Sequence, residues 1–166
     1  MLEGRENLLD PDAIARRINP VDLRKAAIDA ARETIVRTRG YLREKQSFAI
    51  ETTLSSSSIL ETMSQAIEAG FAVNLIYVCL DNPEWNIERV RQRFARGGHD
   101  VPDQDVRRRY ERSLANLSPA VSLAHEAQLY DNSRDQPRLV LEARQGEIVW
   151  RDDDQPTWVV ASGLLN

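Results

Sequence analysis

Cysteine and lysine are both scarce in this chain of 166 residues. Cys79 is its only cysteine, which excludes a disulfide framework or a cysteine-rich zinc site. Its place in the apolar run FAVNLIYVCL predicts a buried thiol in a reducing compartment. Lys25 and Lys45 are the only lysines among 22 basic residues. Arginine therefore carries nearly all the positive charge. Its planar guanidinium suits phosphate or carboxylate, although genomic base composition is the simpler explanation of the bias.

Long apolar runs are also absent. No stretch reaches the ~18 apolar residues of a membrane helix, and the first ten residues, MLEGRENLLD, lack the apolar core of a secretory signal. We therefore expect no membrane segment and a cytoplasmic location. The content of 42% hydrophobic and 29% charged residues is typical of a folded protein, and we expect one domain over residues 1–150 followed by a tail, 151–166. The net charge of −4 gives no reason to expect nucleic-acid binding.

Along the chain, segments whose apolar residues recur with helical spacing alternate with short apolar or alternating segments, and this order predicts alternating helices and strands. Asn19 is predicted to cap the first long helix, and the almost wholly apolar strand 71–80 is predicted to be covered on both faces. The alternation favours an α/β fold with a parallel sheet flanked by helices and a C-terminal β-hairpin. Helices are expected at 19–46, 59–70, 83–98 and 101–117, strands at 48–53, 71–80 and 126–133, and the hairpin at 138–150.

The richest concentration of arginine lies between residues 89 and 112. Eight arginines stand there against four acids, with Gly97-Gly98 between two basic helices. Such a segment can close on a phosphorylated ligand and neutralise its charge. The alternative is a solvated pair of helices joined by arginine–carboxylate pairs, which spacing alone slightly favours. His99 has no second histidine nearby, so we expect it to form a hydrogen bond at the hinge, and we expect no metal site.

Three polar stretches lie at the ends of predicted elements. Glu51–Thr53 ends a strand, where the ligands of open α/β sheets gather, and its carboxylate could bind sugar hydroxyls or cap the next turn. Asp10 and Asp12 precede a short helical turn. Either could act as a general base or cap the helix, and capping is expected for at least one. The loop 131–133 could contact a nucleotide base, but a plain turn is the simpler interpretation.

Together these stretches resemble the zeta-toxin family of P-loop kinases, from about residue 8 to about residue 144. The matching text is DPDAIARRINP, SFAIETTLSS, LIYVCLDNPEWNIERVRQRFARGGHDVPDQDVRRRYERSLANL and LYDNS. GGHDVP followed by an RRRY-type helix is its most specific element. The resemblance implies an ATP- and Mg²⁺-dependent kinase with a central parallel sheet. The toxins of this family phosphorylate a hydroxyl of UDP-N-acetylglucosamine, and an antitoxin protein is a possible partner.

The resemblance also assigns roles to residues of this chain. Asp12 matches the acid that activates the acceptor hydroxyl, and Glu51, Thr52 and Thr53 match the acceptor-binding group. Arg93 or Arg96, together with Arg109, match the arginines of the lid that contact ATP phosphates, with Arg108 or Arg112 as less favoured choices in place of Arg109. Asp131 and Asn132 are expected near the nucleotide.

One part of the family pattern is missing from this sequence. The family begins with a strand and a G-x-x-x-x-G-K-[ST] loop, whose backbone amides, lysine and hydroxyl hold the phosphates and Mg²⁺. Here Gly4 is the only glycine before Gly40, and neither lysine follows a glycine. We therefore expect a chain without the first strand and P-loop, either truncated or degenerate, and inactive alone. The alternative function is a non-catalytic module that binds a sugar nucleotide or a protein. A sheet without its central strand also predicts self-association, closure by a rearranged sheet or poor solubility. The lack of interleaved aromatics disfavours nucleic-acid binding.

Overall fold

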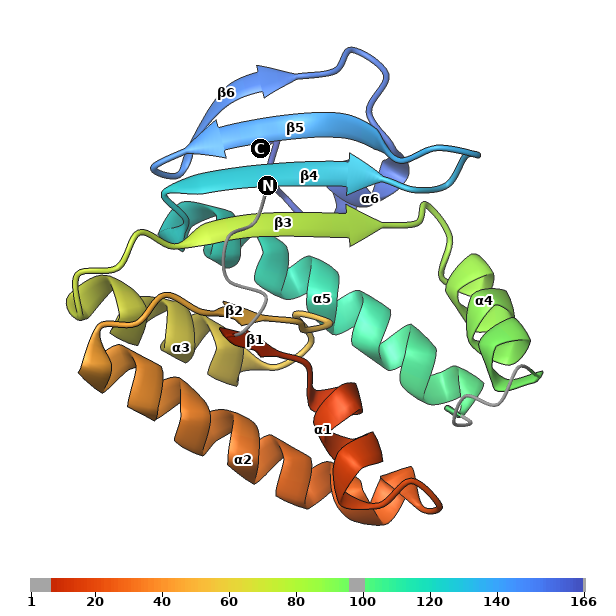
Figure 1. Cartoon of the computed structure of the whole chain (residues 1–166). Coiled ribbons are helices and arrows are strands. Elements are labelled where there is room, and N and C mark those ends of the chain that lie inside the picture. Colours follow the sequence, from red (N-terminus) through yellow and green to blue (C-terminus); the bar gives the residue numbers. More distant parts are fainter. Residues whose placement is uncertain (1–6, 96–100, 166) are drawn as a thin grey trace. The chain divides into compact units, whose positions relative to one another are not determined.

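The structure is a computed structural model that describes residues 7–95 and 101–165, except for the side chain of residue 24 (Figure 1). The chain forms two compact units. Unit 1 comprises Met1–Thr52 with Glu68–Phe71, and unit 2 comprises Thr53–Ile67 with Ala72–Asn166. Each unit contains strands and helices, which confirms an α/β protein. The expected parallel sheet is not confirmed, because the larger of the described sheets has one parallel and two antiparallel strand pairs. Each unit is described by itself below.

Unit 1 is built on two long-range contacts, a parallel strand pair and a helix pair. Strands β1 (Leu8–Leu9) and β2 (Ala49–Ile50) pair in parallel. Helix α1 (Pro11–Ile18) packs on α2 (Leu23–Glu44) through a small core that consists of Ile14, Ala15, Ala26 and Ala30, with Leu23 against it. The predicted strand 48–53 is therefore only two residues long, and β1 was not predicted because two residues carry no periodic signal.

The predicted cap of the long helix was wrong by three residues. Asp22, rather than Asn19, is the N-cap of α2, and its side chain accepts a hydrogen bond from the backbone N–H of Lys25. Asn19 instead ends α1, and its Oδ1 accepts hydrogen bonds from the N–H groups of Val21 and Asp22. Pro20 lies in the turn between the helices, so the sequence N-P begins the turn and not the helix.

Unit 2 contains a four-stranded mixed sheet. Its order is β3-β4-β5-β6, with β3 (Asn74–Cys79) parallel to β4 (Glu126–Asp131) and the remaining pairs antiparallel. Strands β5 (Arg138–Arg144) and β6 (Glu147–Arg151) form the expected hairpin, which turns at Gln145 and Gly146 with positive φ. The helices are α3 (Ser57–Glu68), α4 (Pro83–Ala95), α5 (Asp103–Leu123) and α6 (Thr157–Ala161).

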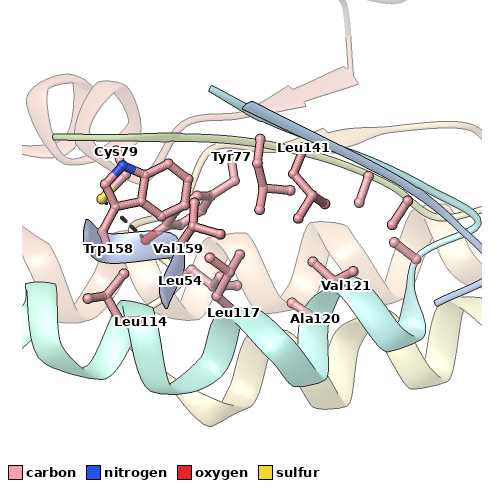
Figure 2. Packing of buried hydrophobic residues seen from close by; sticks show 14 of the residues in the cluster. Leu54, Tyr77, Cys79, Leu114, Leu117, Ala120, Val121, Leu141, Trp158 and Val159 are labelled. Atoms are coloured by element: carbon pink, nitrogen blue, oxygen red, sulfur yellow. Dashed lines mark hydrogen bonds between the residues drawn. The ribbon is translucent and has the colours of Figure 1, made fainter. Parts of the chain in front are cut away.

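Side chains from α3, α5 and α6 pack with the sheet in one hydrophobic core (Figure 2). On β3, Tyr77 and Cys79 point into this core, whereas Ile76 is 61% exposed and Val78 is 54% exposed. The prediction that this strand is covered on both faces was therefore wrong for the described residues. An apolar sequence run does not distinguish a strand buried on both faces from one with an exposed apolar face.

Helix α5 continues beyond its predicted end at residue 117. It runs to Leu123 with Pro119 in its interior. Leu117 and Ala120 are fully buried, so core packing stabilises the turn that contains a proline, which lacks the N–H of a normal helical hydrogen bond. The tail after residue 151, whose role was unreadable in the sequence, forms α6 and inserts Trp158 and Val159 into the core.

Candidate functional site

The residues singled out in the sequence are divided between the two units. Asp12, Glu51 and Thr52 belong to unit 1, whereas Thr53, the described arginines of 89–112, Asp131 and Asn132 belong to unit 2. Arg96, Gly97-Gly98 and His99 lie outside the described residues. We therefore describe two groups of candidate residues, one in each unit.

In unit 1 the acids follow the carboxyl ends of two adjacent parallel strands. Asp10 follows β1 and caps α1, because its Oδ1 accepts a hydrogen bond from the N–H of Ala13 at 3.0 Å. Asp12 is exposed in the first turn of α1. Glu51 follows β2, and its N–H donates to the carbonyl of Leu9 at 2.9 Å. Capping therefore accounts for Asp10 but not for Asp12.

The side chains of Asp12 and Glu51 form no hydrogen bond or ion pair with any residue that the structure describes. Both carboxylates are exposed. Because Leu9 pairs in parallel with Ile50, the residues that follow them, Asp10 and Glu51, lie at the same edge of the small sheet. This edge is where ligands of parallel sheets bind.

In unit 2 most of the described arginines on α4 and α5 are paired. Arg107 forms two hydrogen bonds with Glu84, at 2.7 and 2.9 Å, and these bonds lower the pKa of the Glu84 carboxyl. The other pairs are Arg91 with Asp103 at 2.6 Å, Arg108 with Asp105 at 2.8 Å, and Arg89 with the carbonyl of Asn132 at 3.0 Å. For Arg91, Arg107 and Arg108 the interpretation as solvated helices with arginine–carboxylate pairs holds, whereas Arg89 bonds a loop carbonyl.

Three arginines remain without such a partner. Arg93, Arg109 and Arg112 are exposed and form no hydrogen bond or ion pair within residues 7–95 and 101–165. A guanidinium group that is not neutralised by the protein is available to an anionic ligand. These three side chains are therefore the remaining candidates for phosphate binding.

Two of the three share one side of α5 with an asparagine. Arg109, Arg112 and Asn116 are spaced by three and four residues, which places them on one side of the helix. Asn116 Nδ2 donates to the carbonyl oxygen of Leu54 at 2.8 Å. Arg107 lies about half a turn away from Arg109, on the side that pairs with α4. Arg109 and Arg112 therefore lie on the side of α5 to which Asn116 attaches the segment around residue 54.

The attached segment is a turn rich in hydroxyl groups. Leu54 is buried and has a φ of 57°, an uncommon conformation for a leucine. Because the Leu54 side chain is inserted into the core, the side chains of its neighbours Thr53 and Ser55 face the solvent at least in part. Their hydroxyl oxygens, Thr53 Oγ1 and Ser55 Oγ, lie 2.8 Å apart. The turn leads into α3, which begins at Ser57. We name Thr53, Ser55, Arg109, Arg112 and Asn116 the α5 cluster.

Sequence reasoning missed Asn116 in this cluster. The spacing of three and four residues from the arginines was a usable signal, but its partner Leu54 is 62 residues away in the sequence. Arg93 does not belong to the cluster. Glu84 and Arg91 mark the side of α4 that pairs with α5, and Arg93 is about half a turn from Arg91.

The two predicted nucleotide-loop residues serve the fold. Asp131 is only 4% exposed, and its Oδ1 accepts hydrogen bonds from Ser133 Oγ at 2.6 Å and from Trp158 Nε1 at 3.3 Å. The N–H of Asn132 donates to the carbonyl of Cys79 at 2.8 Å. Both residues therefore fix the end of β4 beside the end of β3.

Two features of the described residues concern metals and membranes. No cluster of three or more histidine, cysteine, aspartate or glutamate side chains in the described ranges could hold a metal ion. Likewise, none of the helices described combines the length and the apolar composition needed to cross a bilayer.

Comparison with known proteins identifies a relative but no activity. No protein-family model matches the chain, and no solved structure matches it. An uncharacterized protein of Haemophilus influenzae is 38% identical over 103 residues, which are 62% of this chain and 74% of that protein. Identity at this level over most of the relative indicates common descent. The chain therefore belongs to the same family as this uncharacterized Haemophilus influenzae protein.

Proposed function

We propose that this chain binds a UDP-sugar, such as UDP-N-acetylglucosamine, as the acceptor-binding part of a kinase of the zeta-toxin type. The observation that carries the proposal is the α5 cluster. In it Arg109 and Arg112, unpaired among the described residues, lie on the side of α5 that holds the Thr53–Ser55 turn. Two guanidinium groups can neutralise a diphosphate, and neighbouring hydroxyl groups can donate hydrogen bonds to its oxygens.

The carboxylates of unit 1 carry a separate hypothesis, which follows from the resemblance and from unit 1 alone. Asp12 and Glu51 are exposed after adjacent parallel strands, and carboxylates accept hydrogen bonds from sugar hydroxyls. In a kinase of this type Asp12 would activate the acceptor hydroxyl, and Glu51 with Thr52 would hold the sugar. ATP and nucleotide sugars are cytoplasmic metabolites, so the proposal places the chain in the cytoplasm.

The residues of this chain do not fit bound ATP and Mg²⁺. A phosphate-binding loop needs glycines directly after a parallel strand, yet the four described parallel strands are followed by Asp10, Glu51, Leu80 and Asn132. The sequence contains no G-x-x-x-x-G-K-[ST]. We therefore expect this chain alone to transfer no phosphate from ATP. This absence favours the second candidate function, a sugar-nucleotide-binding module without catalysis.

Isothermal titration with UDP-N-acetylglucosamine tests the proposal. We expect the unmodified chain to bind and Arg109→Ala and Arg112→Ala each to weaken binding by roughly tenfold or more, because a charge-assisted hydrogen bond contributes ~1.5–3 kcal/mol. Arg151→Ala is the matched control. Arg151 is also exposed and unpaired within the described residues but lies on β6, so its loss should leave binding unchanged.

The outcomes separate the candidates. Absence of binding by the unmodified chain to any UDP-sugar would reject the proposal, and equal weakening by all three variants would indicate a nonspecific charge effect. Phosphate transfer measured with labelled ATP and Mg²⁺ separates the kinase from the binding module. Transfer by this chain alone would show that an ATP site exists without the glycine-rich loop.

A further inference from the structure

The C-terminal segment fastens one particular loop of unit 2. This loop, Asn132–Pro137, joins β4 to β5 and follows the carboxyl end of the only parallel strand pair in the described part of unit 2. Ligands of open α/β sheets bind beyond such carboxyl ends. The residues of the C-terminal segment that fasten the loop lie between Asp152 and Trp158, and Arg89 of α4 also bonds the loop, at the carbonyl of Asn132.

Trp158 forms the first attachment. Its indole N–H donates to Asp131 Oδ1, the same oxygen that accepts the hydroxyl of Ser133. The ring is 1% exposed and packs against Tyr77, with ring centroids 5.6 Å apart (Figure 2). A buried tryptophan thus fixes the carboxylate that orients the first turn of the loop.

Asp81, at the end of β3, forms a second attachment. Its Oδ1 accepts hydrogen bonds from Thr157 Oγ1 at 2.7 Å and from the N–H of Trp158 at 3.3 Å. Its own N–H donates to Ser133 Oγ at 2.8 Å. Ser133 therefore bridges the ends of both parallel strands. The start of α6 is bonded to Asp81, one of the two residues that Ser133 contacts.

Ion pairs form the third attachment, at the far end of the loop. Arg134 Nη2 lies 3.0 Å from Asp154 Oδ2. Arg138 Nη1 lies 2.7 Å from Asp152 Oδ2, and its Nη2 donates to the carbonyl of Asp154 at 2.9 Å. The C-terminal segment is thus bonded to Arg134 within the loop and to Asp131 and Arg138, the residues that flank the loop.

The end of β3 connects this loop to the α5 cluster. Asp81 donates its N–H to Ser133 of the loop, and the carbonyl of the preceding Leu80 accepts the hydroxyl of Tyr110, the neighbour of Arg109, at 2.9 Å.

We propose that the segment Asp152–Trp158 is a strap that sets the conformation of the loop Asn132–Pro137 and, through that loop, the affinity for the sugar nucleotide. The second half of this statement rests on the proposed function, whereas the first half does not. Trp158 and Asp154 are positioning residues in this scheme, since they act on the ligand only through the loop.

Hydrogen exchange followed by mass spectrometry tests the strap without any ligand. Trp158→Phe keeps an aromatic ring in the core and removes the indole N–H, and Asp154→Asn removes the exposed charge that pairs with Arg134. Among the described residues, the loop amide that forms a hydrogen bond is the N–H of Asn132, which donates to the carbonyl of Cys79. We expect both variants to speed its exchange, Trp158→Phe by about tenfold and Asp154→Asn, whose ion pair is exposed, by about twofold, and to leave the other bonded amides of β3 and β4 protected. Trp85→Phe, at a tryptophan that is 47% exposed on α4, is the control and should leave exchange unchanged.

Titration of the same variants with UDP-N-acetylglucosamine tests the coupling. We expect the dissociation constant to rise about three- to tenfold for Trp158→Phe and Asp154→Asn and to stay constant for Trp85→Phe. Unchanged exchange in the loop would overturn the strap. Faster exchange with unchanged affinity would overturn the coupling. Failure of the unmodified chain to bind would reject the proposed function. The hydrogen-exchange rates would then be the test of whether the segment acts as a strap on the loop. If Trp158→Phe does not fold, the exposed Asp154→Asn decides both questions.

Discussion

Cys79 lies in a buried group of hydroxyls at the end of β3. Its Sγ lies 3.4 Å from the carbonyl of Leu80 and 3.8 Å from the hydroxyl of Tyr77, which in turn lies 2.9 Å from Ser113 Oγ. Burial raises the pKa of the Cys79 thiol from its ordinary value to about 11. Burial also raises the pKa of Tyr77 and of Tyr110. The folded protein therefore favours the protonated form of all three groups.

This shift predicts a loss of stability in alkali. Below pH 9 the Cys79 thiol is protonated in both the folded and the unfolded state, and its contribution to the free energy of unfolding is fully present. Between about pH 9 and pH 11 the unfolded chain releases the proton while the folded chain keeps it, so the free energy of unfolding should fall by roughly 1 kcal/mol per pH unit. Urea unfolding from pH 8 to pH 10 measures this slope. Cys79→Ala should make the slope shallower, with the remaining slope near pH 10 due to Tyr77 and Tyr110, and an equal slope in that variant would contradict the assignment.

The arginines show what a sequence can and cannot predict about single residues. Their types and positions indicated a phosphate-binding segment, but not which guanidinium groups are free. Arg107 and its partner Glu84 are 23 residues apart, so their pairing depends on how α4 and α5 pack. The same holds for Asn116, whose place in the α5 cluster depends on the buried Leu54. The spacing of residues in the sequence predicts which side chains share one side of a helix. Whether those side chains form ion pairs depends on which other elements pack beside the helix.

Elements were predictable where local signals and packing agree. The hairpin β5–β6 follows from two apolar runs around Gln145-Gly146, and both turn residues have positive φ. Helix α6 was not predictable, because five residues carry too little periodicity and its stability comes from burial of Trp158 and Val159. The same reason explains the extension of α5 past Pro119.

Pro119 provides a test of this account of α5. The proline is exposed in the helix interior and cannot donate a hydrogen bond to residue 115. Pro119→Ala restores the donor, so we expect the free energy of unfolding to rise by about 1 kcal/mol, less than the full cost of an interior proline because the unfolded chain gains freedom. Thermal unfolding followed by tryptophan fluorescence suits this test, since Trp85, Trp150 and Trp158 all belong to unit 2.

Ser118→Ala, one residue earlier in the same helix, is the control for this substitution. It changes neither the backbone donors nor the proline and should shift the unfolding midpoint little. A lower stability of Pro119→Ala than of the unmodified chain would mean that packing of Leu117 and Ala120 requires the local geometry that the proline imposes.

At the scale of the whole molecule, the strands belong to two separate sheets, β1-β2 and β3-β4-β5-β6. Within the described residues β3 pairs only with β4, so its other edge presents unpaired N–H and C=O groups. Natural edge strands are usually protected by lysine, proline or a bulge. The strand NLIYVC contains no charged residue and no proline, and Ile76 and Val78 are exposed.

An unprotected apolar edge predicts self-association through β3. We expect the weight-average mass from light scattering to rise with protein concentration. Val78→Lys should suppress this rise, because a charged side chain on the exposed face opposes stacking and pairing with a second edge. Val160→Lys is the matched control, since Val160 on α6 is 59% exposed and Val78 54%, and it adds the same charge away from the edge. If the unmodified chain stays monomeric at all concentrations, the edge is occupied in solution, and protection of the β3 amides against hydrogen exchange should then exceed that of β6, the opposite edge.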